Sequence, residues 1–247
     1  MSALAAAIQF LLITPAFVRR QFTPKDLGAS ITFFPLVGLL LGSVLAAFDV
    51  LLAYAFPLQV RSALLLALWI SLTGALHFDG FVDACDGLLG GHTPEHRMEI
   101  MRDEHTGAFG TAGGILVLLA MYAALNSMPL QRTAGLLLAP VLGRCAIALS
   151  VVTYPYARAA GLGRQIKDEA QPRHATAAVL TALAVAGCLG WQAGILLPAA
   201  AVAGAFIVWR LAAAFVMHRI GGMTGDTYGA INMLIEVTVL LAFAAQP

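Results

Sequence analysis

The sequence has few charged residues and few cysteines, and each shortage excludes a class of protein. Only 11% of its 247 residues are charged, whereas 60% are hydrophobic and the mean hydropathy is +0.85. Soluble domains carry about 25% charged residues, so an ordinary soluble domain is excluded. The three cysteines are scattered, with no CxxC pair, which argues against a disulfide framework or a cysteine metal site. A net charge of +1, with no basic patch among aromatics, gives no indication of nucleic-acid binding.

What the sequence does have is long apolar runs separated by short polar segments. This pattern predicts an all-α fold: one transmembrane domain over residues 1–247, built as a polytopic bundle of roughly seven or eight spans. The first run is expected to be a retained span, since no basic region precedes it and no clear cleavage site follows. An interfacial position for that run is the alternative. The expected spans are 2–18, 31–56, 63–77, 107–126, 134–153, 175–189, 195–215 and 229–245.

The Lys and Arg residues predict which side each connection faces. Ten of them lie in the connections 19–30, 78–106, 154–174 and 216–228, and only Arg61 and Arg132 lie in the three others. Basic residues collect on the cytoplasmic side. We therefore expect the polar segments 78–106, 154–174 and 216–228 on the cytoplasmic side of the membrane. Eight spans would leave both termini outside.

The segment from His77 to Gly110 holds seven of the 13 acidic residues and four of the six histidines. Asp79, Asp83 and Asp86 are spaced i, i+4, i+7, which places them on one helix face. Three carboxylates so close repel one another, and a divalent cation removes that penalty. All-oxygen ligation suits Mg²⁺ or Mn²⁺, so these three are the predicted metal ligands. A solvated acidic face at a helix end is the structural alternative. We interpret Gly80 and Gly87 as positions where a phosphate-bearing group approaches the backbone.

The segment breaks at Gly90-Gly91 and predicts a second helix, with Thr93 as N-cap and Pro94 as first residue. A helix to about His105 would place Asp103 on one face with Glu95 and Glu99. Asp103 is the preferred site residue, because an acid near a helix C-terminus has no simple structural reason. The run from His92 to His96 matches the H-x-x-E-H order of metalloproteases, but Pro94 leaves His92 outside the helix. His77 is expected either to contact substrate or transfer a proton, or to be an ordinary interfacial histidine.

A second polar cluster, Gly221 to Asp226, precedes the last span on the same predicted side. Its Gly-rich turn, with Thr224, Gly225 and Asp226, is suited to binding a phosphate; helix capping is the structural alternative. Asp226 either adds a carboxylate to a metal or holds a basic partner. Glu236 inside the last span should face the bundle interior, and Arg144 inside another span expects an anionic partner.

Together these motifs resemble cobalamin synthase, the adenosylcobinamide-GDP ribazoletransferase family. The first family signature is matched by His77, Asp79, Gly80, Asp83, Asp86 and Gly87, followed by Arg102, Asp103, Gly107 and Gly110. The second is matched by Gly221, Gly222, Thr224, Gly225, Asp226, Gly229 and Ala230. The likeness covers nearly the whole chain in order. Glu104 departs from it, because the family commonly has a small residue there.

The resemblance implies a Mg²⁺-dependent enzyme that joins adenosylcobinamide-GDP to α-ribazole, or to its 5′-phosphate, with release of GMP. On this reading Asp79, Asp83 and Asp86 hold the metal, and Asp103 or His77 is the base. Arg102, Arg144, Glu236 and the Thr224–Asp226 turn contact substrate. Membrane lipid is an expected partner, and a homo-oligomer or contacts with other corrin-pathway enzymes are possible.

Two alternatives are weaker. CDP-alcohol phosphotransferases also use an Asp-x-x-Asp-Gly run, but they have Ala-Arg soon after it, where this chain has Leu88-Leu89. A cation-coupled transporter would place carboxylates near span midpoints in related halves. Here most carboxylates cluster at one predicted face, with Glu236 and Asp49 as exceptions.

Overall fold

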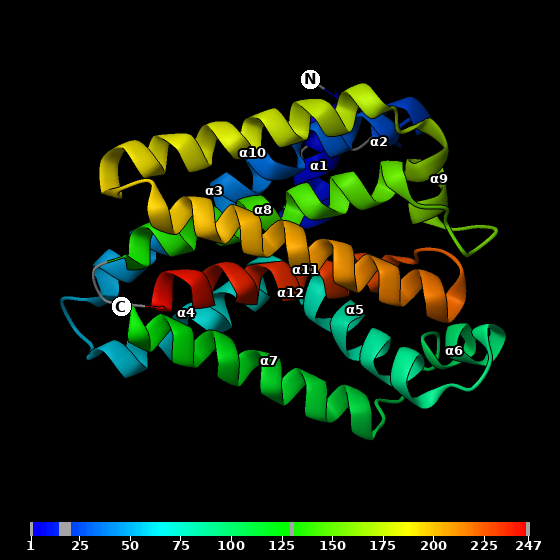
Figure 1. Cartoon of the computed structure of the whole chain (residues 1–247), viewed down its shortest axis with the longest axis horizontal. Helices are drawn as coiled ribbons and strands as arrows, with labels where there is room; N and C mark the ends of the chain where they lie inside the picture. The colour runs from blue at the N-terminus through cyan, green and yellow to red at the C-terminus, as the bar shows by residue number, and fades with distance from the viewer. Residues whose placement is uncertain (1, 15–20, 129–130, 246–247) are drawn as a thin grey trace.

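The computed structural model describes residues 2–14, 21–128 and 131–245, and for Gln192 and Ala193 it describes the backbone alone. These residues form helices joined by short connections, with a single isolated bridge between Tyr156 and Met223. The predicted all-α fold is confirmed (Figure 1). The helices are α1 (Ser2–Leu11), α2 (Pro24–Ser30), the 3₁₀ turn η1 (Ile31–Phe33), α3 (Phe34–Leu52), α4 (Leu58–Leu72), α5 (Leu76–Cys85), the π-helical turn η2 (Asp86–Gly90), α6 (Pro94–Ile100), α7 (Ala108–Ser127), α8 (Arg132–Thr153), α9 (Leu162–Glu169), α10 (Pro172–Ala193), α11 (Leu196–Ile220) and α12 (Gly225–Ala244).

Six helices in the described ranges are long and apolar enough to cross a membrane, and the number is seven if a bent pair of helices is counted as one span. This agrees with the lower of the two predicted numbers. The expected first span is absent in its described part, because α1 has only 10 residues and a span needs about 20. Residues 15–18 of the span predicted at 2–18 lie outside the described residues, and the position of the two termini relative to the membrane stays a prediction. The spans are Pro24–Leu52, the pair Leu58–Leu72 and Leu76–Gly90, then Ala108–Ser127, Arg132–Thr153, Pro172–Trp191, Leu196–Ile220 and Gly225–Ala244.

The bent pair corrects the span predicted at 63–77. Helices α4 and α5 meet at an angle of 92°. Gly74 and Ala75 both have left-handed backbone conformations, with φ of 60° and 57°, and this ends α4 before α5 begins. The aspartates at 79, 83 and 86 therefore lie on the second half of a broken span, and not in a connection that begins at residue 78. Broken helices at membrane depth occur where they line a cavity.

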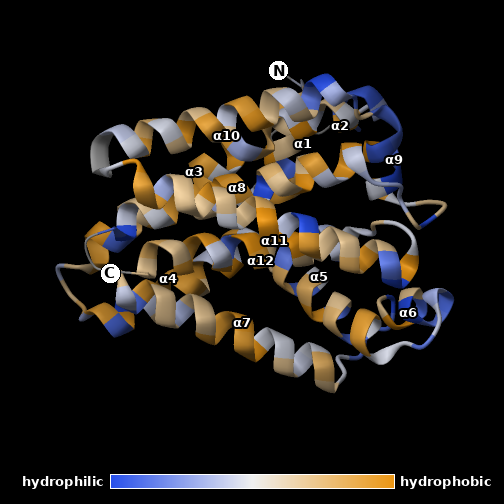
Figure 2. Cartoon of the chain, in the orientation of Figure 1, coloured by the Kyte–Doolittle hydropathy of each residue, from blue (hydrophilic) through white to orange (hydrophobic). Residues whose placement is uncertain are grey.

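The connections separate into two groups at opposite ends of the bundle. In Figure 1 the α3–α4, α7–α8 and α10–α11 connections lie at one end, and α6, α9 and the α11–α12 turn lie at the other. Figure 2 shows hydrophilic residues concentrated at α2, α9 and α6, while the long helices are mostly apolar. The basic connections thus share one end.

Helices α8 and α12 form the centre of the bundle. The membrane segment of α8 is 83% buried and that of α12 is 67% buried, more than any other span. Helix α5 packs closely on α12: a Cβ atom added to Gly80 would lie 3.0 Å from Asp226 Cα, and one added to Gly229 would lie 3.1 Å from the carbonyl oxygen of His77. The two glycines bring the aspartates of α5 next to the first turn of α12.

Candidate active site

A cleft of about 200 Å³ opens where α5 meets the first turn of α12. One side is polar and carries His77, Asp79 and Asp226. The other side is apolar and comes from α1, α3, α8 and α9. Its lining includes Phe10, Phe34, Ile147, Val151, Leu162 and Ile166. Of the residues predicted to form the site, the cleft collects His77, Asp79, Gly80, Gly225 and Asp226.

Asp79 and Asp83 differ from every other carboxylate on the membrane-spanning helices. Within the described residues they have no hydrogen bond or ion pair, whereas Asp26, Asp49, Asp86, Asp226 and Glu236 all have one. Asp83 interacts electrostatically with the carboxylates of Asp79, Asp226 and Asp86, and with the Arg158 guanidinium. Asp83 thus lies among three other carboxylates and one guanidinium, and two of those carboxylates, Asp79 and Asp226, line the cleft. Neighbouring carboxylates repel one another unless a cation binds between them.

Asp226 is held by a basic partner, one of the two roles predicted for it. Nη2 of Arg158 lies 2.5 Å from Oδ2 of Asp226. The segment that carries Arg158 is fixed to the α11–α12 turn by two backbone hydrogen bonds: Ala157 N–H donates to Met223 O, and Met223 N–H donates to Pro155 O, both at 2.8 Å. This segment therefore forms a strap beside the cleft. Asp226 Oδ1 has no hydrogen bond to any residue that the structure describes.

Asp86 has a different task from the one predicted. Its Oδ2 accepts the backbone N–H of Gly107 at 2.8 Å and its Oδ1 accepts that of Gly110 at 2.7 Å. These N–H groups lie at the start of α7, and without Asp86 they would have no hydrogen-bond acceptor. A Cβ atom at either glycine would lie within 2.6 Å of the Asp86 carboxylate. The two glycines of the G-x-x-G sequence thus leave the space that the Asp86 side chain occupies.

The Gly221–Asp226 segment connects two helices. Gly221 ends α11 in the left-handed conformation, with φ of 73°. Thr224 is fully buried as the N-cap of α12: its Oγ1 accepts Thr227 N–H at 3.2 Å, and Thr227 Oγ1 accepts Thr224 N–H at 2.8 Å. For Thr224 the capping alternative is therefore the one observed, and its side chain does not reach the cleft.

Gly80 and Gly87 are also packing positions, and the approach of a phosphate-bearing group to the backbone there stays a prediction. Gly80 faces Asp226 across the α5–α12 contact. A Cβ atom at Gly87 would lie 2.5 Å from Met101 Cγ and 2.7 Å from Arg97 O, so this glycine lets η2 pack against α6.

Arg144 and Glu236 pair with each other in the bundle interior. Both side chains are buried, and Arg144 Nη1 donates to Glu236 Oε1 at 2.5 Å. The interior location of Glu236 and the anionic partner of Arg144 are confirmed, but in this arrangement neither side chain lines the cleft. His77 separates the two regions: it lines the cleft on one side and, with Glu236, a cavity of about 10 Å³ on the other. Its Nε2 has no hydrogen-bond partner among the described residues.

The second half of the acidic segment lies apart from the cleft. Thr93 caps α6 as predicted, with its Oγ1 accepting His96 N–H, and His92 stays outside the helix. The predicted helix to His105 is wrong, because α6 ends at Ile100. Asp103 Oδ1 instead accepts His105 N–H at 3.0 Å, a local bond that competes with helix. Arg102 and Asp103 are exposed and do not line the cleft.

Some residues of the site carried no signal in the sequence. Tyr156 and Tyr228 lie beside Asp226 with ring centroids 6.0 Å apart, and Tyr228 lines the cleft. Burial raises the pKa of the Tyr156 hydroxyl. Arg158 was visible only as one of four basic residues in a connection. Its approach to Asp226, 68 residues away, depends on the strap and cannot be read from local spacing.

The donor set fits a divalent cation, but in a different way from the predicted triad. The described residues contain no group of three or more His, Cys, Asp or Glu side chains placed to hold a metal. Mg²⁺ usually takes one or two protein carboxylates and completes its shell with water and substrate phosphates. Asp79 and Asp83, whose oxygens are free of hydrogen bonds, meet that requirement. Asp86 has both oxygens engaged by α7.

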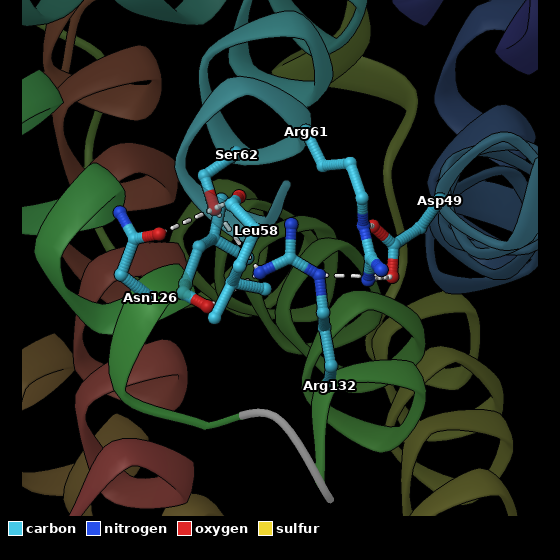
Figure 3. A network of polar contacts seen from close by, with 7 residues as sticks. Asp49, Leu58, Arg61, Ser62, Asn126 and Arg132 are labelled. Carbon is cyan, nitrogen blue, oxygen red and sulfur yellow. Dashed lines mark hydrogen bonds and ion pairs between the residues drawn. The ribbon is translucent and has the colours of Figure 1, made fainter. Parts of the chain in front are cut away.

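A second ionic cluster lies at the other end of the bundle (Figure 3). Asp49 Oδ2 accepts Arg132 Nε at 2.8 Å and Arg61 Nη2 at 3.0 Å. Arg132 also donates to Ser62 Oγ at 3.1 Å and to the carbonyl oxygen of Leu125. This cluster ties α3, α4, α7 and α8 together.

Comparison with known proteins agrees with the motifs. The family model for cobalamin-5-phosphate synthase matches residues 3–244. The chain belongs to this family. Curated members of the cobalamin-5-phosphate synthase family that resemble it are named adenosylcobinamide-GDP ribazoletransferase. That of Desulforamulus reducens is 41% identical, covering 97% of this chain and 94% of the relative, and that of Stutzerimonas stutzeri is 41% identical, covering 98% of each. That of Pseudomonas fluorescens strain Pf0-1 is 39% identical, covering 96% and 97%. No solved structure matches the chain.

Proposed function

We propose that this chain is an adenosylcobinamide-GDP ribazoletransferase. It joins adenosylcobinamide-GDP to α-ribazole, or to its 5′-phosphate, and gives adenosylcobalamin, or its 5′-phosphate, and GMP. The family membership and the names of the relatives support the reaction. The observation that carries the site assignment is that Asp79 and Asp83 alone, among acids on the described spans, lack a partner. Asp79 lines the cleft with Asp226, and Asp83, which is not among the lining residues, interacts electrostatically with both carboxylates.

We assign the reaction's Mg²⁺ requirement to Asp79 and Asp83. When bound there, Mg²⁺ neutralises charge on the pyrophosphate and on the GMP leaving group. The pyrophosphate would lie between these carboxylates and the first turn of α12, whose N-terminal end favours anions. Arg158, already fixed beside Asp226, is the nearest cation for phosphate oxygens. Asp86 contributes indirectly by holding α7 against η2.

The acceptor hydroxyl attacks the phosphorus on the cobinamide side, and the bond from that phosphorus to the oxygen shared with GMP breaks. His77 is the better candidate for the base, because it lines the cleft and has a free Nε2, whereas Asp103 is exposed elsewhere. A base must be within hydrogen-bond reach of the proton it removes. The proton thus moves from the hydroxyl to His77.

The apolar side of the cleft suits the aromatic base of α-ribazole. Phe34 and Phe10 stack there with centroids 6.1 Å apart, and Leu162 closes the wall from α9. Burying a flat apolar ring against such a wall is favourable by roughly 25 cal/mol per Å². We expect Leu162→Ala to raise the KM for α-ribazole about fivefold and to leave the KM for adenosylcobinamide-GDP unchanged. Steady-state kinetics with each substrate varied in turn measures this, and an equal rise in both constants would contradict it.

The cleft faces the cytoplasm of a bacterium in this proposal, at the inner membrane. Support comes from the basic connections, which share the end of the bundle where α6, α9 and the α11–α12 turn lie (Figure 1). The reaction is tested with the purified chain in detergent, given Mg²⁺ and both substrates. Cobalamin and GMP should appear in equal amounts. Liposomes containing the protein should show no ion flux; flux without product would favour the transporter alternative.

A further inference from the structure

Arg210 is an exposed cation on the membrane helix α11, level with the end of α8, because it bonds to Tyr154, which directly follows the last residue of α8. Its Nη1 donates to Tyr154 Oη at 2.8 Å, and its Cζ lies 5.7 Å from the centroid of the Trp209 ring. No described carboxylate lies within ion-pair distance of it. Charged side chains within membrane spans are costly and normally pair with an opposite charge. The two partners of Arg210 are neutral, so its charge is uncompensated by the described protein.

A long apolar groove begins next to this arginine. Figure 1 shows α10 and α11 diverging from their connection, with α8 between them. The groove they form with α8 has a volume of about 620 Å³, within the range of small-molecule sites. Its lining is almost entirely apolar and includes Leu149, Val179, Ala182, Ala203, Phe206 and Trp209.

Trp209 joins the cation to the groove. The ring lines the groove, its Nε1 donates to Ser150 Oγ at 2.8 Å, and it packs edge-to-face on Tyr154 with centroids 6.0 Å apart. The indole is therefore fixed, with Arg210 over its face. The arrangement is an apolar channel with a positive charge and a hydroxyl at one end.

We propose that this groove binds an anionic phospholipid. One acyl chain lies along α8, α10 and α11, and the phosphate accepts hydrogen bonds from Arg210 and from the Tyr154 hydroxyl. Charge complementarity favours this occupant, since a zwitterionic lipid leaves the surplus positive charge in place and an apolar helix brings no anion. Nucleotide-bearing substrates fit poorly, because their polar groups would lose hydrogen bonds in a lining without polar partners. The site is separate from the cleft and independent of the transferase reaction.

The test uses fluorescence of the full-length protein in phosphatidylcholine nanodiscs. Trp69→Phe with Trp191→Phe leaves Trp209 as the only tryptophan. Lipids with brominated acyl chains quench it on contact. Brominated phosphatidylglycerol should reach half-maximal quenching at a several-fold lower mole fraction than brominated phosphatidylcholine. A juxtamembrane arginine contributes about 1 kcal/mol to binding an anionic lipid, so Arg210→Gln should remove about fivefold of that preference.

Arg219→Gln is the matched control, because Arg219 also stacks on an aromatic ring of α11, with its Cζ 5.0 Å from the Phe215 centroid, but does not border the groove. It should leave the preference unchanged. Ala203→Phe, which fills the groove from an exposed position, should weaken quenching by both lipids. If the two lipids quenched Trp209 equally in the protein that retains Arg210, the proposal would be overturned. So would a stable dimer in which neither lipid reaches Trp209, because a second copy would then fill the groove.

Discussion

The two ionic clusters at opposite ends of the bundle are made of the same residue types and are balanced in opposite ways. At one end, Arg61 and Arg132 enclose a single carboxylate, Asp49, and every member has a partner (Figure 3). At the other end, the carboxylates of Asp79, Asp83 and Asp226 interact with one another, and Arg158 supplies one guanidinium, which pairs with Asp226. The first cluster stabilises the fold by itself. The second has surplus negative charge beside a cleft, which is the arrangement expected where a cation and a phosphate-bearing substrate complete the site.

Asp49→Ala should give the largest effect, and it should be on stability. Removing one partner of a buried ion pair costs about 3 to 5 kcal/mol, because the remaining charges stay buried. Thermal unfolding in detergent measures the loss, while activity per folded molecule should be unchanged. Asp168→Asn is the control: its pair with Arg164 is about half exposed, and exposed pairs contribute little. Loss of turnover in folded Asp49→Ala protein would remove the distinction between the two ends.

Asp83→Asn should have the opposite effect. We expect turnover to fall at least about 100-fold, as when one electrostatic group of an active site is removed. The fold should be no less stable than the parent, since the substitution relieves repulsion among neighbouring carboxylates. Expression, membrane insertion and unfolding temperature are measured beside activity. Near-normal turnover would eliminate Asp83 from the site.

Asp86 separates the two kinds of role within one motif. Asp86→Ala removes the acceptor for two N–H groups of α7 and should cost about 1 to 2 kcal/mol of stability, as other lost helix caps do. Asp86→Asn keeps one amide oxygen and should cost less. The Mg²⁺ concentration for half-maximal activity distinguishes the alternatives: it should shift with Asp79→Asn and remain near the parent value with Asp86→Asn. A shift as large as that of Asp79→Asn would restore the three-aspartate metal site.

Asp103→Asn should have the smallest effect, less than about twofold in turnover at neutral pH, because this exposed side chain lies outside the cleft. Hydrogen bonds from His105 hold the pKa of Asp103 below its usual range. If Asp103 were the base, activity would therefore persist on acidification until the pH fell below that range. We expect the acidic limb of the pH–rate profile to be the same in parent and variant. If the acidic limb of Asp103→Asn differed from that of the parent, Asp103 would be the base.

The sequence predicted those features that depend on local pattern. Apolar run lengths indicated the polytopic helical fold, the i, i+4 spacing placed Asp79 and Asp83 on one helix, and Thr93-Pro94 located the start of α6. Features that depend on distant contacts were missed. The break at Gly74-Ala75 lies within a continuous apolar run, so hydropathy alone did not indicate it. The hydrogen bonds from the N–H groups of α7 to Asp86 join positions more than 20 residues apart.

Arg144 and Glu236 show the same limit. Each was expected to need an interior partner, but their pairing across 92 residues depends on how α8 packs on α12. Arg144 Nε and Nη2 still have no hydrogen-bond partner among the described residues, so a contact with substrate stays a prediction. Spacing along the chain thus identified which residues are unusual, and packing determined which of them remain available for chemistry.

The most direct test of the account is a Mg²⁺ titration of the purified chain with adenosylcobinamide-GDP and α-ribazole, with GMP and cobalamin both measured. The parent protein should form the two products in equal amounts, should stop when a chelator removes Mg²⁺, and should recover when Mg²⁺ is restored. Asp83→Asn should remain inactive at every Mg²⁺ concentration. Equal product formation in the presence of the chelator, or full activity of Asp83→Asn, would contradict the assignment of these aspartates as a metal-dependent transferase site.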